Sequence, residues 1–113
     1  MEIKKQYGDF TKQEIFNLSQ GTGELLKNQP DGLILDIDRL VILTDTKEIR
    51  GEVKEKDIMH IITTDGATYS TESPTVQSTI LQAIDFMETH NLKFSLFRSE
   101  SKSGRIFMNV SLI

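Results

Sequence analysis

The pattern of apolar positions predicts one long helix in the second half of the chain. Apolar residues recur there at helical spacing and form one stripe: Val76, Ile80, Ala83, Ile84 and Met87. Ser73 is suited to cap this helix, Pro74 to be its first residue and Asn91 to end it. Gln77 and Asp85 fall mainly away from the stripe, so we expect them on the solvent side.

A shorter helix is predicted near the N-terminus, over the sequence DFTKQEIFNLSQGTG. Thr11 is a good N-cap, and Glu14 stands three residues later as its capping-box partner. Ile15 begins the apolar face, and Gly21 and Gly23 end the helix.

Sequences rich in Leu, Ile and Val predict strands in the first half of the chain. Residues 33–37 and 40–45 form two strands or one bent strand. Residues 46–57 are charged and contain Gly51, so we expect a loop or a hairpin tip there.

The sequence IMHIITTDGATYST predicts a strand, a tight turn at Asp65-Gly66 and a short strand through Tyr69. Two more alternating strands follow the long helix. Because strands and helices do not alternate regularly, a doubly wound parallel sheet is disfavoured. We expect one α+β domain over residues 1–113, with a mostly antiparallel, curved sheet. A five-stranded barrel of the OB type, with its helix before the last two strands, is compatible with this order.

Composition narrows the class of protein. The 113-residue chain has no cysteine, so disulfides and thiolate chemistry are excluded. No apolar run approaches the roughly 20 residues of a membrane span, and no signal peptide is recognisable, so we expect a cytosolic protein with no membrane partner. The net charge is -4 and the isoelectric point about 5.1, which disfavours a strongly basic nucleic-acid binder.

The charge is nevertheless unevenly distributed. One segment, residues 93–105, has four basic residues and one acidic residue: Lys93, Arg98, Lys102, Arg105 and Glu100. A basic segment in an acidic chain is informative about partners rather than about fold.

Catalytic and metal-binding chemistry is not indicated. His60 and His90 have no second ligand at metal spacing, so both are interpreted as structural. Asp36 and Asp38 are two residues apart on a strand, a spacing that can hold Mg²⁺, but no third carboxylate accompanies them. The recognised nucleophile, nucleotide-binding and zinc motifs do not occur, so we expect no metal, no cofactor and no enzymatic activity.

Alternation divides the C-terminal hairpin into two faces. The core face is predicted to contain Leu92, Phe94, Leu96, Ile106, Met108, Val110 and Leu112. Phe97 and Phe107 fall on the other, polar face, and a hairpin that closes around residues 99–104 brings them close to opposite each other. The cations expected around this pair are Lys93, Lys102 and Arg105, with Arg98 nearby.

Three interpretations of this aromatic pair are open. Exposed rings with cations around them suit single-stranded nucleic acid, whose bases stack on the rings while its phosphates meet the cations. Alternatively, Phe97 and Phe107 lie beneath the N-terminal helix with Phe10 or Phe16. In the third interpretation they form a protein interface. The loop SESKSGR can likewise bind phosphate or be an ordinary flexible tip.

The sequence TTDGATYSTESPTV, followed by SKSGRIFMNVSL, resembles small single-stranded-DNA-binding proteins of phages and mobile elements of Gram-positive bacteria. The similarity covers roughly residues 33–113. It implies an OB-like barrel, a replication accessory role in the host cytoplasm, and DNA contact through Tyr69, Lys102, Arg105 and Phe107. The overall acidity departs from what tight DNA binding favours.

The function predicted from the sequence is therefore single-stranded DNA binding in phage or mobile-element replication. The residues predicted to bind nucleic acid are Tyr69, Lys93, Phe97, Arg98, Lys102, Arg105 and Phe107. The alternative is an acidic accessory module that docks on a host or viral protein, as an inhibitor or adaptor. A protein partner and a homo-oligomer are both open.

Overall fold

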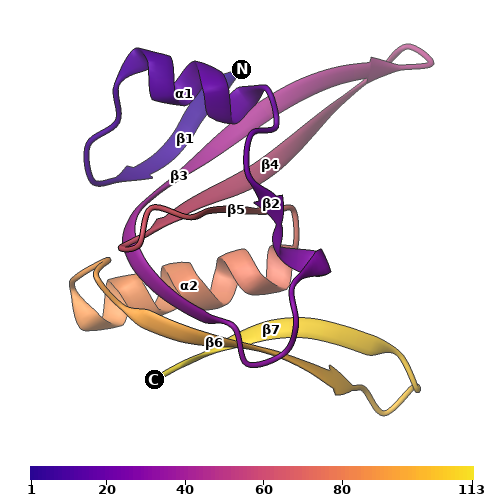
Figure 1. Ribbon diagram of the computed structural model, residues 1–113. Coiled ribbons are helices and arrows are strands. Elements are labelled where there is room, and N and C mark those ends of the chain that lie inside the picture. Colours follow the sequence, from indigo (N-terminus) through magenta and orange to yellow (C-terminus); the bar gives the residue numbers. More distant parts are fainter.

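A computed structural model describes residues 1–113, the side chain of Lys47 excepted. One curled sheet holds all the strands and encloses the longer helix (Figure 1). The elements in chain order are β1 (Glu2–Tyr7), α1 (Lys12–Ser19), β2 (Glu24–Leu25), the 3-10 helix η1 (Leu26–Asn28), β3 (Ile34–Ile49), β4 (Glu52–Thr63), β5 (Thr68–Thr71), α2 (Pro74–Met87), β6 (Lys93–Glu100) and β7 (Ile106–Leu112). Within the described residues, neither α-helix has the length and apolar character that crossing a membrane requires.

Strand β3 connects the two halves of the sheet. Its first residues pair with β6, and from Ile37 onward it pairs with β4 and then also with β1. The register with β4 shifts between Ile37 and Arg39, and such a bulge bends a strand. Of the two predicted alternatives, two strands or one bent strand, the structure has the single bent strand. The bend lets β3 serve both halves of a curled, OB-like half-barrel.

The half-barrel remains open along one side. The strand order is β2-β5-β4-β3-β6-β7, with β1 attached to β3, and every pair is antiparallel except β2 with β5. Among the described residues, β5 and β7 do not pair with each other. Helix α2 lies within the curl, with β3 to β5 on one side and the β6–β7 hairpin on the other (Figure 1). The fold is therefore α+β with a mostly antiparallel, curved sheet, as predicted.

The β3–β4 hairpin is longer than predicted. Residues 46–57 are paired strand almost throughout, from Thr46 opposite Glu55 to Ile49 opposite Glu52. Only Arg50 and Gly51 form the turn, both with positive φ, as two-residue hairpin turns require. The prediction of a hairpin tip is thus confirmed, and the alternative of a loop was wrong. The arm is largely exposed on both faces, so its strands carry no apolar alternation that would reveal them.

The start of α2 was predicted correctly and its end was not. Ser73 caps the helix by accepting a hydrogen bond from the backbone N–H of Val76 at 3.2 Å, and Pro74 is its first residue. The helix ends at Met87, four residues before the predicted Asn91, because Glu88 adopts a left-handed conformation with φ 57°. Asn91 instead donates to the carbonyl oxygen of Asp38.

The buried face of α2 differs from the predicted stripe at two positions. Met87 is 46% exposed, because it is the last residue of the helix and lies outside the main core cluster. Gln77 is buried, although it was expected on the solvent side. Its side-chain amide donates to the carbonyl oxygens of Asp57 and Thr71 at 3.1 and 3.0 Å, and these bonds offset the cost of burying an amide.

Helix α1 covers the outer face of the sheet. The predicted capping box is present, since Thr11 Oγ1 accepts from the backbone N–H of Glu14 and the Glu14 carboxylate accepts from that of Thr11. A small apolar cluster joins the helix to β3: Ile15, Leu18, Val41 and Leu43, with Phe10 against them. The main core lies on the other face of the sheet, around α2.

The last strand contributes less to the core than its alternation predicts. Val110 is buried, but Ile106 is 76% exposed and Leu112 is 44% exposed. Met108 is half-buried. The three residues predicted for the preceding strand are buried: Phe94 and Leu96 on β6, and Leu92 just before it. The difference arises because β7 is an edge strand of an open barrel, so both of its ends extend beyond the core.

Candidate nucleic-acid interface

The tip of the β6–β7 hairpin is a closed turn. The backbone N–H of Ser101 donates to the carbonyl of Arg105 at 2.8 Å, and that of Gly104 donates to the carbonyl of Ser101 at 2.9 Å. Gly104 has φ 81°, which favours glycine. The hydroxyl of Ser101 accepts a further bond from the backbone of Arg105. Lys102 and Arg105 therefore project from a turn that has its own hydrogen-bond network.

The two phenylalanines share one face of this hairpin but are not opposite each other. Phe97 pairs with Asn109, and Phe107 pairs with Ser99, so the rings are diagonal neighbours. They are therefore neighbours, as predicted, but displaced by two residues along the strands rather than directly opposite. Phe107 is 40% exposed, and Phe97 is half-buried.

Burial beneath the N-terminal helix does not account for this pair. The apolar cluster under α1 contains Phe10, whereas Phe97 and Phe107 belong to neither core cluster of the described residues. Phe16 is itself 59% exposed. The interpretation that α1 covers the pair is therefore wrong, and the base-stacking and protein-interface interpretations stay open.

The predicted cations differ in what they already bind. Lys102 and Arg105 are exposed and form no ion pair with any described residue. Lys93 lies 3.9 Å from the carboxylate of Asp36, and both side chains are largely exposed. Arg98 is engaged: its Nη1 donates to Asp31 at 2.6 Å. The hairpin tip thus holds the two cations that are free to meet an anion.

Tyr69 lies apart from the hairpin. It belongs to β5, where it pairs with Ile61 of β4 and Glu24 of β2, and its half-buried ring packs against the main core. Burial raises the pKa of its phenol, and the nearby carboxylates of Asp65 and Glu24 add to this shift. The structure therefore does not bring Tyr69 together with the other predicted residues.

A cavity of about 360 Å³ lies beside β4 and β5. It is lined by Gly21, Leu25, Lys27, Ile58, His60, Ser70, Thr71, Glu72, Ser73 and Met108. His60 pairs with Val41, which packs under α1, and with Ser70, so these side chains share the α1 side of the sheet. The segment with β2 and η1 descends from α1 past β5 toward the β6–β7 hairpin, and it forms another wall (Figure 1).

The sequence does not predict this cavity. His60 alternates with Met59 and Ile61, so it was interpreted as structural, and nothing local separates that role from a cavity wall. The cavity arises when residues 21–27 fold over β5 and Met108 reaches across from β7. These contacts join distant parts of the chain, which no periodicity encodes.

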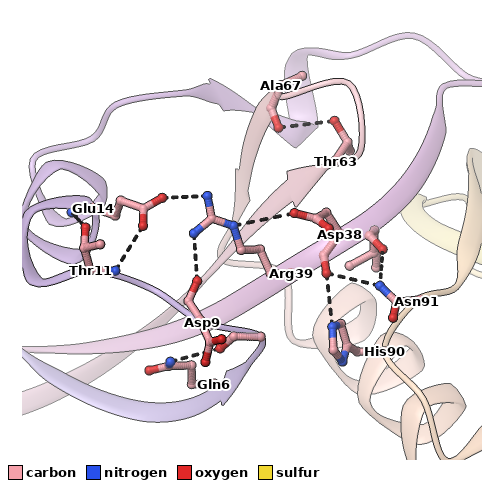
Figure 2. A network of polar contacts seen from close by, with 12 residues as sticks. Gln6, Asp9, Thr11, Glu14, Asp38, Arg39, Thr63, Ala67, His90 and Asn91 are labelled. Carbon is pink, nitrogen blue, oxygen red and sulfur yellow. Dashed lines mark hydrogen bonds and ion pairs between the residues drawn. The ribbon is translucent and has the colours of Figure 1, made fainter.

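A network of polar contacts fixes the bulge of β3, on the side away from the hairpin tip (Figure 2). The guanidinium of Arg39 lies 2.6 Å from the carboxylate of Glu14 and donates to the carbonyl of Asp9 at 2.8 Å. Its hydrogen bond, with one from the backbone of Thr11, lowers the pKa of Glu14 to about 2. His90 Nε2 lies 3.0 Å from the carbonyl oxygen of Asp38. The network therefore anchors α1 and the turn after α2 to the same point of the sheet.

The two aspartates considered for Mg²⁺ have cationic neighbours instead. Asp38 lies 3.7 Å from Arg39, and Asp36 lies 3.9 Å from Lys93. Of the side chains that the structure describes, no three His, Cys, Asp or Glu residues are grouped so that they could hold a metal ion. The described residues thus offer these carboxylates ion pairs rather than a metal site.

Comparison with known proteins gives consistent matches. The family described as "Phage Single-stranded DNA-binding protein" matches residues 9–113. A single-stranded DNA-binding protein of Bacillus phage phi29 is 30% identical over 102 residues, which cover 88% of this chain and 82% of the relative. The corresponding protein of Bacillus phage PZA matches equally well, and that of Bacillus phage B103 is 27% identical over 118 residues, covering 99% of this chain and 97% of the relative. No solved structure gives a significant match.

Proposed function

The chain belongs to the phage single-stranded DNA-binding protein family, and from this premise we propose that it binds single-stranded DNA in phage replication through the β6–β7 hairpin. The named relatives are themselves single-stranded DNA-binding proteins of Bacillus phages. The hairpin combines the two groups that such binding needs, a ring for bases and cations for phosphates.

One observation carries the proposal. Phe107 is 40% exposed on a strand face, one residue from Ile106 and two from the tip cation Arg105. Lys102 and Arg105 form no ion pair with any described residue, although acidic residues outnumber basic ones in the whole chain. The ring and the two unpaired cations therefore lie on one hairpin, where a single strand can contact both. A base stacked on Phe107 brings its phosphates toward this tip.

The other predicted residues take lesser parts in the proposed interface. Phe97 is a diagonal neighbour of Phe107 and offers a second, more buried ring. Lys93 has only a distant carboxylate partner, so a phosphate can compete for it. Arg98 is held by Asp31 and contributes through the position of β6 rather than by direct contact.

The test is titration of a fluorescent oligo-dT strand at about 50 mM and about 200 mM salt. Phe107→Ala should weaken binding by about 1–3 kcal/mol, the range for one stacked base. Lys102→Gln and Arg105→Gln should each lower the slope of log affinity against log salt by about 0.7, the value for one phosphate contact on a single strand.

Matched controls separate the hairpin from the rest of the surface. Phe86→Ala removes a ring that is 86% exposed on α2, and Lys5→Gln removes an exposed lysine of β1 that has no ion pair in the described structure. Both controls should leave affinity and salt slope near the wild-type values. An absence of wild-type binding at the lower salt concentration contradicts the function. Binding that the hairpin and control variants change equally contradicts the assigned surface.

A further inference from the structure

The cavity beside β4 and β5 has the size and lining of a small-ligand site. Its volume of about 360 Å³ lies within the range that such sites occupy. Its apolar side chains come from three separate parts of the chain: Leu25, Ile58 and Met108. Hydroxyl groups of Ser70, Thr71 and Ser73 line it as well. An apolar space with a few polar groups suits a flat ring that has a hydrogen-bonding edge.

His60 is the polar residue of this wall whose hydrogen bonding is incomplete. Its side chain is only 3% exposed, and Nδ1 is buried without a partner among the described residues. Burial lowers the pKa of the imidazole and so favours the neutral ring, in which one nitrogen is a donor and the other an acceptor. An unpaired buried ring nitrogen is costly, and the χ2 torsion of histidine is soft. A small turn of the ring lets a ligand in the cavity supply the missing bond.

The apolar side chains suit the faces of a nucleobase. Ile58 comes from β4 and Leu25 from β2, so they approach the space from different directions. Met108 adds a thioether from β7, and thioether sulfur makes favourable contacts with aromatic rings. A nucleobase has two flat faces that contact apolar side chains and an edge that forms hydrogen bonds, and the cavity lining provides both kinds of contact.

The charge at the rim suits a nucleotide rather than a neutral metabolite. Glu72 is already paired with Lys56 at 2.9 Å, so its carboxylate is compensated. Lys27 is exposed and forms no ion pair with any residue the structure describes. Its ammonium group is available for the phosphate next to a bound base.

The cavity is physically continuous with the β6–β7 hairpin. Met108 pairs with Arg98 across the hairpin, and Arg98 donates to the backbone carbonyl of Lys27 at 2.8 Å. Because side chains alternate along a strand, Met108 lies on the face opposite Phe107. In the path that we consider, a strand stacked on Phe107 passes the cationic tip and continues to the face that carries Met108.

We propose that this cavity takes one base of the bound DNA strand, with His60 at its polar edge and the three apolar side chains against its faces. The inference rests on the proposed function and adds a second contact to it. The protein then has two places that contact bases: a pocket that encloses one base and the open surface at Phe107.

The first test uses the wild-type protein. The chain has two histidines, so a His90→Gln variant identifies which imidazole nitrogen signals belong to His60 in a long-range ¹H–¹⁵N spectrum. Addition of oligo-dT should move the Nδ1 signal of His60, because a hydrogen-bond partner arrives. A strand whose thymines are all replaced by abasic sites should bind more weakly, because it also lacks a base for Phe107, and at saturation it should leave the signal unmoved. An unmoved His60 signal at saturation with oligo-dT overturns the inference.

The second test uses substitutions inside the cavity. His60→Leu removes the ring nitrogens while keeping an apolar side chain, and it should weaken oligo-dT binding roughly two- to tenfold, the loss of one neutral hydrogen bond. Met108→Trp fills the space from β7 and should weaken binding at least as much. His90→Leu, the matched control, should leave binding unchanged.

The outcomes separate this inference from the proposed function. If the wild-type protein fails to bind oligo-dT at low salt, both the base pocket and the proposed function are refuted. If wild-type binds and depends on Phe107, but His60→Leu and Met108→Trp bind like wild-type, only the base pocket is refuted. Should His60→Leu fail to fold, the spectrum of the wild-type protein and the Met108→Trp titration still decide the question.

Discussion

Arg98 Nη1 donates to the carboxylate of Asp31 at 2.6 Å, joining residues 67 positions apart in the sequence. The same guanidinium donates through Nη2 to the carbonyl of Lys27. Two further backbone bonds act beside it, from Gly32 to Leu96 at 2.7 Å and from Leu96 to Leu33 at 2.9 Å. Arg98 therefore fastens the segment before β3 to the outer part of β6, and this segment includes a wall of the cavity.

Breaking this contact should affect stability more than DNA affinity. Asp31→Asn and Arg98→Gln should each lower the free energy of unfolding by up to about 1 kcal/mol, because the pair is partly exposed. The double variant should lose little more than either single variant, as measured by urea denaturation. If Arg98 contacts phosphate instead, Arg98→Gln alone will flatten the salt dependence of oligo-dT binding while Asp31→Asn will not.

Two residues on the same face of β7 should respond very differently to truncation. Val110→Ala should lower the free energy of unfolding by about 1.5–3 kcal/mol, since it removes two methyl groups from a buried side chain. Ile106→Ala should change it by less than about 0.5 kcal/mol, because Ile106 is 76% exposed. Thermal unfolding of the two variants checks this difference, and equal losses would show that the outer end of β7 is packed.

The carboxylate of Glu14 makes stability depend on pH in the acid range. Its pKa in the folded protein is about 2, lowered from 4.5 chiefly by the hydrogen bond from Arg39. A lowered folded pKa means that the stabilisation is fully present above the unfolded pKa and is lost as pH falls from about 4.5 toward 2. Urea denaturation at several pH values should show wild-type and Glu14→Gln converging in that window. Parallel curves for the two proteins would exclude this assignment.

Glycine is required where the segment after α1 meets β5. A Cβ built on Gly23 lies 2.9 Å from Thr68 Cγ2 and 3.1 Å from the Thr68 carbonyl oxygen, and φ is 110°. Gly23→Ala should therefore strain the backbone and displace β2 from β5. Gly21 also has positive φ but meets nothing within 4 Å, so Gly21→Ala should cost only the conformational penalty of about 1–2 kcal/mol. The difference between the unfolding midpoints of the two variants measures the cost of the contact with Thr68. If the cavity receives a base, Gly23→Ala should also lower the affinity for oligo-dT more than Gly21→Ala does.

Features encoded by neighbouring residues were predictable from the sequence. The capping box of Thr11 and Glu14, the Ser73 cap and the Asp65-Gly66 turn each depend on residues within a few positions of one another. Their hydrogen bonds form whatever the rest of the chain does, so local rules suffice to find them. The α+β class follows from the order of such elements.

Features that depend on distant contacts were not predictable. Ile106 and Val110 occupy equivalent positions in the alternation, yet only Val110 reaches the core, because β7 is an edge strand. The arrangement of the candidate site also depends on contacts between distant parts of the chain. Sequence alone places Lys102, Arg105 and Phe107 on one hairpin, but it gives no sign that Arg98 already has a carboxylate partner. His60 becomes part of a cavity wall only because residues 21–27 fold over β5.

The cationic turn at the end of the β6–β7 hairpin also affects how the molecule meets DNA from a distance. The segment from Lys93 to Arg105 has an excess of positive charge, while the remainder of the chain is strongly negative. This uneven distribution of charge means that a polyanion attracts the basic segment more than the rest of the molecule. The same acidic body repels adjacent copies along a strand, so bound molecules favour spacing over crowding at low ionic strength.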